Sequence, residues 1–156
     1  ACDLSKVSIF LLNEIEGGQI TGELNEEKIL EKLLNMYPDA QIVLTLGKDG
    51  AIYAHKDKIY RQPIFEVKAV DTTAAGDTFT GYFLAGLTSG MDIEDILKMS
   101  AKASSIAVTR QGAVQSIPLK EEVVKSLKEA WFIKFFIVLD LLNDLCKNKK
   151  CRLMAL

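Results

Sequence analysis

The sequence has few of the residues that build disulfide frameworks and thiolate metal sites. Its 156 residues include three cysteines and one histidine. Cys2, Cys146 and Cys151 lie near the two ends of the chain and form no Cys-x-x-Cys pair. This cysteine usage argues against a structural zinc site, and it favours a protein that works in the reduced cytoplasm.

A strong net charge and a long apolar run are lacking as well. The formal net charge of −2 gives no indication of a nucleic-acid partner. The longest apolar cluster, residues 131–142, is too short for a membrane span and contains Lys134 and Asp140. No signal peptide is visible in the first residues. Because 49% of the residues are hydrophobic, the chain can bury a sizeable core, and we expect a soluble protein of one-domain length.

Short apolar runs alternate with helical patterns along the chain. The runs expected to form strands are 8–12 and 41–46, followed by the two arms of a hairpin, 51–55 and 58–61. The segments expected to form helices are 25–37 with Asn25 as N-cap, 78–88, 92–108, and a last helix from Pro118. This alternation predicts an α/β fold, in which a three-layer, mainly parallel, Rossmann-like sheet with a short β-hairpin is flanked by helices. The active site is expected at the carboxyl ends of the strands.

The segment VDTTAAGDTFTG, residues 70–81, removes side-chain bulk from a turn between a strand and a helix. Ala74, Ala75 and Gly76 allow backbone N–H groups to approach a ligand at the positive end of the helix, which suits phosphate. The helix dipole keeps Asp77 ionised, and its carboxylate can accept a proton. A hydroxyl activated in this way could attack a terminal phosphate whose developing charge the N–H groups stabilise. For the turn taken alone, an N-cap role for Asp77 is an equal alternative.

Three further segments accompany this turn. They are NEIE (13–16), which follows an apolar run and precedes the turn QITG, then TLGKDG (45–50), and IAVTRQGAVQSIP (106–118). Together with VDTTAAGDTFTGYFLAGL, these segments resemble, in the same order, the motifs of the ribokinase-like (PfkB) carbohydrate kinases, and of the bacterial ribokinase branch in particular. The resemblance covers about residues 8–129 and is highly specific, because it joins four ordered motifs.

The resemblance implies that the γ-phosphate of ATP is transferred to a sugar hydroxyl, with ribose as the favoured sugar. Asp77 would be the base, and Ala74, Ala75 and Gly76 would form the anion hole. The residues that the resemblance places against the nucleotide are Asn13, Thr45, Gly47, Lys48, Asp49, Gly50, Gly76 and Asp77.

The resemblance also implies two metal sites. Glu16, with Asn13, would organise Mg²⁺ and its waters near the phosphates, since Mg²⁺ prefers oxygen ligands and retains water. A monovalent cation such as K⁺ would lie beside the anion hole, with ligands from Asp71, Thr73, Ala107, Arg110, Gly112 and Ser116. Each residue taken alone also has an ordinary interpretation: Glu16 as a solvated acid, Asp71 as the cap of an Asx-type turn, and Gly112 and Ser116 as parts of a turn.

Two features depart from the family pattern. Members usually run to about twice this length, and nothing here resembles their N-terminal half, which supplies most sugar contacts and a small β lid. We therefore expect residues 1–129 to be the C-terminal, nucleotide-binding and catalytic half of a ribokinase-like domain, weak or inactive as a kinase by itself. Residues 130–156 form an atypical tail, apolar and then basic.

Several interpretations of the chain stay open. The tail could be a helical extension that covers surface left bare by the missing half or lies at a dimer interface. It could also be a partner-binding or membrane-surface helix, or a frameshifted or artificial end. The partners expected are a sugar and either a second copy of the chain or the missing N-terminal half. The alternatives to a kinase are a non-catalytic nucleotide-binding module and an interaction fragment.

Overall fold

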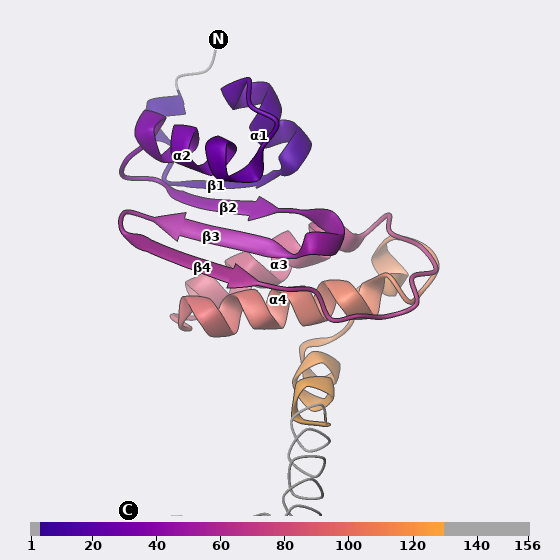
Figure 1. The fold of residues 1–156 in the computed structure, drawn as a ribbon. Helices are drawn as coiled ribbons and strands as arrows, with labels where there is room; N and C mark the ends of the chain where they lie inside the picture. Colours follow the sequence, from indigo (N-terminus) through magenta and orange to yellow (C-terminus); the bar gives the residue numbers. More distant parts are fainter. Residues whose placement is uncertain (1–3, 130–156) are drawn as a thin grey trace, which may run out of the picture. The chain divides into compact units, whose positions relative to one another are not determined.

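The computed structural model describes residues 4–129 (Figure 1). The predicted tail over 130–156 and all three cysteines lie outside the described residues. The chain divides into two compact units, residues 1–118 and residues 119–156. In the second unit residues 120–129 are helical, which confirms the helix predicted after Pro118. Among the described residues, no helix is both long and apolar enough to span a membrane.

The first unit is built on a four-stranded sheet with the order β1-β2-β3-β4. Its strands are β1 (Ile9–Asn13), β2 (Gln41–Thr45), β3 (Ala51–His55) and β4 (Lys58–Gln62). β1 and β2 are parallel, whereas β2–β3 and β3–β4 are antiparallel. The α/β architecture and the hairpin are confirmed, and the sheet is mixed. The antiparallel pairs follow from the short connections, because a parallel pair needs a long crossover.

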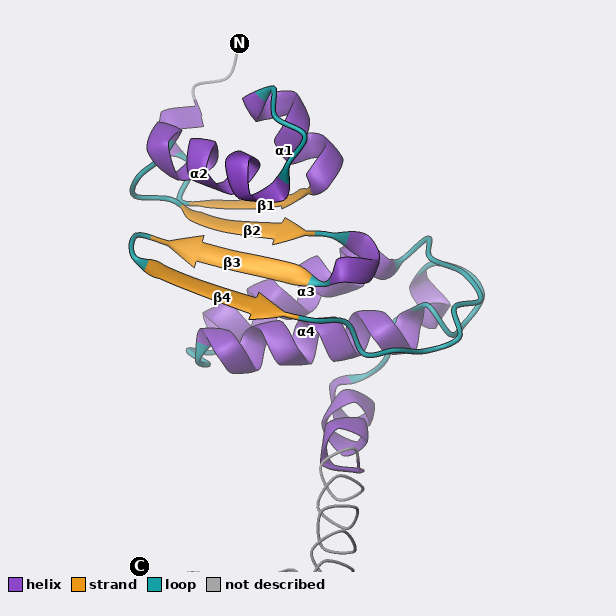
Figure 2. Cartoon of the chain, viewed as in Figure 1, coloured by secondary structure: helices purple, strands orange, loops and turns teal. Residues whose placement is uncertain are grey.

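Helices cover both faces of this sheet (Figures 1 and 2). One face carries α1 (Glu14–Thr21) and α2 (Glu26–Met36), and the other carries α3 (Ala75–Thr88) and α4 (Ile93–Ala107). The predicted three layers are therefore confirmed. Short 3₁₀ turns occupy Leu4–Lys6, Gly47–Asp49 and Val114–Ser116.

Alternation along β2 builds a separate core on each face. Ile42 and Leu44 pack toward α2, whereas Val43 packs toward α3 and α4. All three side chains are buried. A strand that is apolar on both faces is typical of the centre of an α/β sheet, as the sequence predicts.

The predicted helix starts agree with the structure in two cases and differ in one. Asn25 caps α2, its Oδ1 accepting hydrogen bonds from the N–H groups of Glu27 and Lys28 at 3.1 and 3.2 Å. Asp92 precedes α4 as predicted. By contrast, α3 begins at Ala75, three residues before the expected start at Thr78. Ala75 and Gly76, which the sequence predicts in the anion hole, are thus part of the helix.

Candidate active site

The start of α3 presents two backbone N–H groups that no hydrogen bond within the helix uses. The N–H of Ala75 donates to the carbonyl of Thr72 at 3.1 Å, and helical bonding begins with Thr78, whose N–H donates to Ala74 at 2.9 Å. Among the described residues, the N–H groups of Gly76 and Asp77 have no acceptor. Both residues are exposed. Two free donors at the positive end of a 14-residue helix are suited to bind an anion.

A cavity of about 430 Å³ opens beside these donors. Its wall comes from the turn after β2, the loop after β4, the first residues of α3 and the carboxyl-terminal half of α4. Ile64, Phe65 and Val67 line it from the loop, and Phe79 lines it from α3. Its volume lies in the range of small-molecule sites. An apolar chamber next to an anion site suits a ligand with an aromatic base and a phosphate chain.

The turn after β2 is shaped by two glycines in the left-handed region. Gly47 has φ 53° and Gly50 has φ 97°, and a Cβ on Gly50 would collide with the carbonyl of Gln62. Of the residues predicted here, Thr45, Gly47, Lys48 and Gly50 line the cavity, and Asp49 does not. The N–H of Asp49 instead donates to Leu46 within the turn.

Asn13 and Glu16 form a capping box at the start of α1. The N–H of Glu16 donates to Asn13 Oδ1 at 2.8 Å, and the N–H of Asn13 donates to Glu16 Oε2 at 2.9 Å. Neither residue lines the cavity, but Asn13 pairs with Thr45, which does. Each side chain therefore satisfies a backbone donor at the end of β1.

The geometry of Asn13 and Glu16 indicates how Mg²⁺ could be held. Within residues 4–129 no group of three or more His, Cys, Asp or Glu side chains could hold a metal ion. Glu16 is exposed, and its second carboxylate oxygen, Oε1, has no hydrogen-bond partner among the described residues. One carboxylate with a free oxygen fits a Mg²⁺ ion that keeps several waters and takes phosphate oxygens as its other ligands.

Asp71 ties the segment before α3 to the loop after α4. Its Oδ1 accepts hydrogen bonds from the hydroxyl of Thr73 at 2.6 Å and from the N–H of Thr73 at 2.9 Å, and its Oδ2 accepts from the N–H of Gly112 at 3.0 Å. These bonds, the Thr73 hydroxyl first, lower the pKa of Asp71 to about 2. The turn expected at Asp71 is present, and it also reaches a residue 41 positions away.

Of the remaining residues implied for a monovalent cation, Ala107 is the last residue of α4. Arg110, Gly112 and Ser116 follow in the segment that Asp71 contacts through Gly112. The N–H of Arg110 donates to the carbonyl of Ala107 at 3.0 Å, and its guanidinium lies 3.5 Å from the carbonyl oxygen of Ser116. Asp71, Thr73 and Gly112 are bonded directly. The groups that could bind a cation here are backbone carbonyl oxygens and the carboxylate of Asp71. They are oxygen ligands of the kind that a hard cation takes.

Asp77 is the third residue of α3, and Ala74 is the N-cap. This arrangement excludes the N-cap role that the sequence left open for Asp77. Its exposed side chain makes no hydrogen bond to other described residues, and it follows Gly76, which lines the cavity. Asp77 therefore offers a free carboxylate beside the unpaired N–H groups, whereas Ala74 is buried.

Comparison with known proteins agrees with this geometry. The family model described as pfkB family carbohydrate kinase matches residues 2–120. The chain belongs to the pfkB family. It is 38% identical over 125 residues to a ribokinase of Staphylococcus aureus, covering 77% of this chain and 41% of that protein. With a ribokinase of Lactococcus lactis it shares 36% over 117 residues, covering 75% of this chain and 37% of that protein.

Solved ribokinases share the fold of this pfkB chain. A ribokinase from Thermotoga maritima superposes with a TM-score of 0.73 at 37% identity, over 80% of this chain and 43% of that one. Arabidopsis thaliana ribokinase, solved with ribose and ATP, gives a TM-score of 0.74 at 32% identity, over 80% of this chain and 42% of that one. The chain thus spans about two fifths of the length of these relatives.

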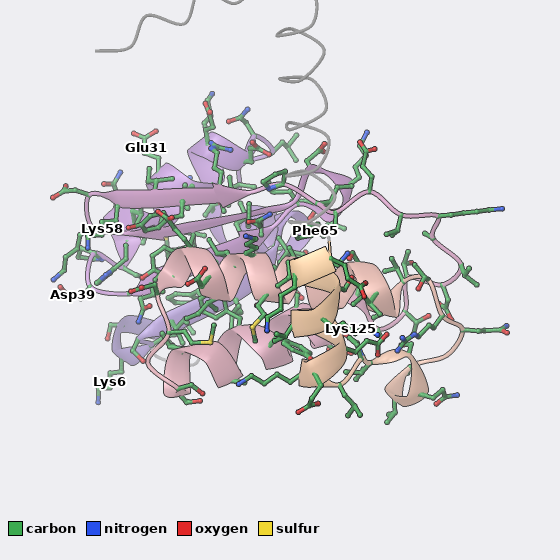
Figure 3. The ribbon with its side chains drawn as sticks, turned by 90° about the horizontal axis from the view of Figure 1, so that it is seen from below. Lys6, Glu31, Asp39, Lys58, Phe65 and Lys125 are labelled. Atoms are coloured by element: carbon green, nitrogen blue, oxygen red, sulfur yellow. The ribbon has the colours of Figure 1, made fainter. Side chains whose placement is uncertain are left out.

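Sequence motifs did not indicate several cavity residues of this pfkB chain. Phe65, labelled in Figure 3, lines the cavity, and the ammonium of Lys102 lies 5.0 Å from its ring centroid. Ser104 and Ser105 line the cavity from α4. The Ala- and Ser-rich composition of α4 indicates close packing, but it does not reveal which hydroxyls face a ligand.

Proposed function

We propose that this chain carries the ATP-binding and phosphoryl-transfer machinery of a sugar kinase, with Asp77 as the base. The observation that carries the proposal is the pair of free N–H groups at Gly76 and Asp77. Gly76 lines the cavity, and Asp77 next to it has an exposed carboxylate. The nucleotide base occupies the apolar chamber beside Phe65 and Phe79, and the terminal phosphate lies at the start of α3.

Transfer then follows from these positions. The sugar hydroxyl gives its proton to the carboxylate of Asp77, and its oxygen attacks the γ-phosphorus. The bond from this phosphorus to the bridging oxygen breaks, and ADP leaves with the electron pair. Charge on the phosphoryl oxygens is stabilised by the N–H groups of Gly76 and Asp77, which are already oriented before the reaction.

Two cations complete the proposed site. Mg²⁺ neutralises phosphate charge when bound, and Glu16 orients its waters through the oxygen that the capping box leaves free. A monovalent cation such as K⁺ would be held by backbone oxygens of the two segments that Asp71 joins, 71–73 and 107–116. Asp71 holds these segments together, because both of its oxygens accept hydrogen bonds from them.

Ribose is the proposed acceptor. The relatives from Staphylococcus aureus and Lactococcus lactis are named ribokinases, and the Arabidopsis thaliana structure contains ribose and ATP. We propose that residues 1–129 correspond to the nucleotide-binding half of such an enzyme and that most sugar contacts come from outside these residues. The low cysteine content supports the reduced cytoplasm as its location.

Direct binding and turnover test this function. Titration of the chain with the imido analogue of ATP and Mg²⁺ should show saturable binding, and Asp77→Asn should bind the analogue with similar affinity. In any form that phosphorylates ribose, the same substitution should lower kcat by about 10²- to 10⁴-fold, because the general base is lost. Absence of binding would refute the nucleotide site. Binding without ribose-dependent ADP formation, even after addition of a sugar-binding half, would favour the non-catalytic module.

A further inference from the structure

The hydroxyl of Ser104 on α4 holds the first residue of α3. Its Oγ donates a hydrogen bond to the carbonyl oxygen of Ala75 at 2.9 Å, across 29 positions of sequence. Both residues line the cavity. The other two serines of α4 bond within their own helix, Ser100 to the carbonyl of Ile96 at 2.8 Å and Ser105 to the carbonyl of Lys102 at 2.7 Å.

The Ala75 carbonyl belongs to the same peptide group as the N–H of Gly76. A peptide group is planar, and in the trans form its C=O and N–H point in opposite directions. A hydrogen bond that fixes the Ala75 carbonyl therefore also fixes the direction of the Gly76 N–H. It polarises the peptide group too, which makes the N–H a stronger donor.

Backbone bonds also order this part of the chain. Because α3 begins at Ala75, the Ala75 carbonyl takes part in the regular bonding of the helix, and Ser104 adds a contact to it from a second helix. The carbonyl of Val108 accepts the N–H groups of Val70 at 2.7 Å and of Asp71 at 3.2 Å. Asp71 in turn accepts from Gly112. These contacts fix the approach to α3 five or more residues before Gly76. Among the described residues, Ser104 is the one whose side chain makes a hydrogen bond to the Ala75–Gly76 peptide group.

We propose that Ser104 is a positioning residue of the phosphate site, which aims and polarises the Gly76 N–H toward the terminal phosphate of ATP. The inference rests on the proposed function, since it takes ATP as the ligand. Ser104 acts on the phosphate end of the ligand through the backbone, whereas the apolar residues of the cavity act on the base.

Two ligands separate this role from a general effect on the fold. Adenosine carries the base and ribose without phosphate, and the imido analogue of ATP adds the triphosphate. Ser104→Ala should weaken binding of the analogue about three- to ten-fold, the loss of one hydrogen bond. Its affinity for adenosine and its unfolding midpoint should stay near those of the wild type. Ser104→Thr keeps the hydroxyl and should restore affinity for the analogue.

A matched control lies one turn earlier on the same helix. Ser100→Ala removes a hydroxyl that is buried, bonds within α4 and does not line the cavity. It should leave the affinity for both ligands unchanged.

The outcomes distinguish this inference from the function on which it rests. If Ser104→Ala lowers the affinity for both ligands equally, or for neither, the positioning role is wrong while the nucleotide site stands. If Ser104→Ala and Ser104→Thr lower the affinity for the analogue equally, the effect comes from the shape of the cavity. That result would also overturn the positioning role of Ser104. If the wild-type chain binds neither ligand, the proposed function fails, and the role of Ser104 falls with it.

Discussion

At Gly76, a larger side chain should affect stability and nucleotide binding in opposite directions. A Cβ built on it meets no atom within 4 Å, so alanine fits the folded chain without a clash. Gly76→Ala should raise the free energy of unfolding by up to about 1 kcal/mol, because alanine favours helix over glycine. The same methyl group enters the space beside the free N–H groups, and affinity for the ATP analogue should fall about tenfold or more.

Gly81 provides the matched control for this change. It lies in the same helix, it is exposed, and a Cβ on it also meets open space, but it does not line the cavity. Gly81→Ala should stabilise the chain to a similar extent and leave nucleotide affinity unchanged. Thermal unfolding and calorimetric titration measure both quantities. Unaltered affinity in Gly76→Ala would contradict the proposed phosphate position.

Asp71 gives a pH-dependent contribution to stability with a definite sign. Hydrogen bonds from Thr73 and Gly112 lower its pKa in the folded chain from 3.8 to about 2. A lowered folded-state pKa stabilises the fold above pH 3.8, and this stabilisation is lost as the pH falls toward 2. The difference in unfolding midpoint between the wild type and Asp71→Asn should therefore be larger at pH 6 than at pH 2.

Asp39 serves as the control for this titration. It is exposed and directed outward in Figure 3, and it makes no hydrogen bond to other described side chains. Asp39→Asn should change the midpoint little at pH 6. The unfolding midpoints of the wild type and of Asp71→Asn could differ by the same amount at both pH values. That result would show that the Asp71 hydrogen bonds do not depend on its charge.

At the scale of elements, α1 is the helix that the sequence does not predict. Its sequence, EIEGGQIT, contains two adjacent glycines and has no apolar periodicity. It forms because the capping box fixes its first turn and because Gly17 allows close packing: a Cβ there would lie 2.8 Å from the Ile29 side chain and 3.2 Å from that of Leu44. Such packing is decided by residues far along the chain, so local patterns do not reveal it.

Glu16 has a hydrogen bond in the capping box and a proposed role in binding Mg²⁺. The substitution Glu16→Gln tests the two roles separately. Glu16→Gln can still accept the hydrogen bond from the Asn13 N–H, because either side chain completes a capping box. Stability should therefore change by less than about 0.5 kcal/mol, within the range of ordinary surface changes. The gain in ATP-analogue affinity on adding Mg²⁺ should nevertheless shrink, because the charge is gone.

Glu16→Ala should lose both properties, with a destabilisation of about 1 kcal/mol typical of a broken cap. Chemical denaturation and titrations with and without Mg²⁺ measure the two effects. A full Mg²⁺ response in Glu16→Gln would assign Glu16 to the helix cap alone.

At the scale of the whole molecule, the site lies within one compact unit. Every residue that lines the cavity falls between Thr45 and Val108, inside the unit of residues 1–118. Deletion of residues 130–156 should therefore leave affinity for the ATP analogue unchanged, which titration of the shortened chain would check. A loss of affinity together with a loss of cooperative unfolding would show that the unit depends on the deleted segment.

The same deletion tests the role left open for the tail. Sedimentation or light scattering before and after deletion compares the size of the assembly. A smaller assembly would support an interaction role for residues 130–156, and an unchanged size would remove that support.

Local patterns and ordered motifs were enough to predict the α/β class, the strands apolar on both faces, the cap at Asn25 and the family. They also indicated Gly76 and Asp77 as neighbours at a helix start. The folded structure was needed to see that α3 begins early enough to expose their N–H groups and that Asn13 and Glu16 cap a helix. It also decided that Ser104 reaches Ala75. The Ser104 bond joins residues 29 positions apart, which local propensity leaves undetermined. The Asn13–Glu16 capping box is local, but the helix that it begins also depends on the packing of Gly17 against Ile29 and Leu44.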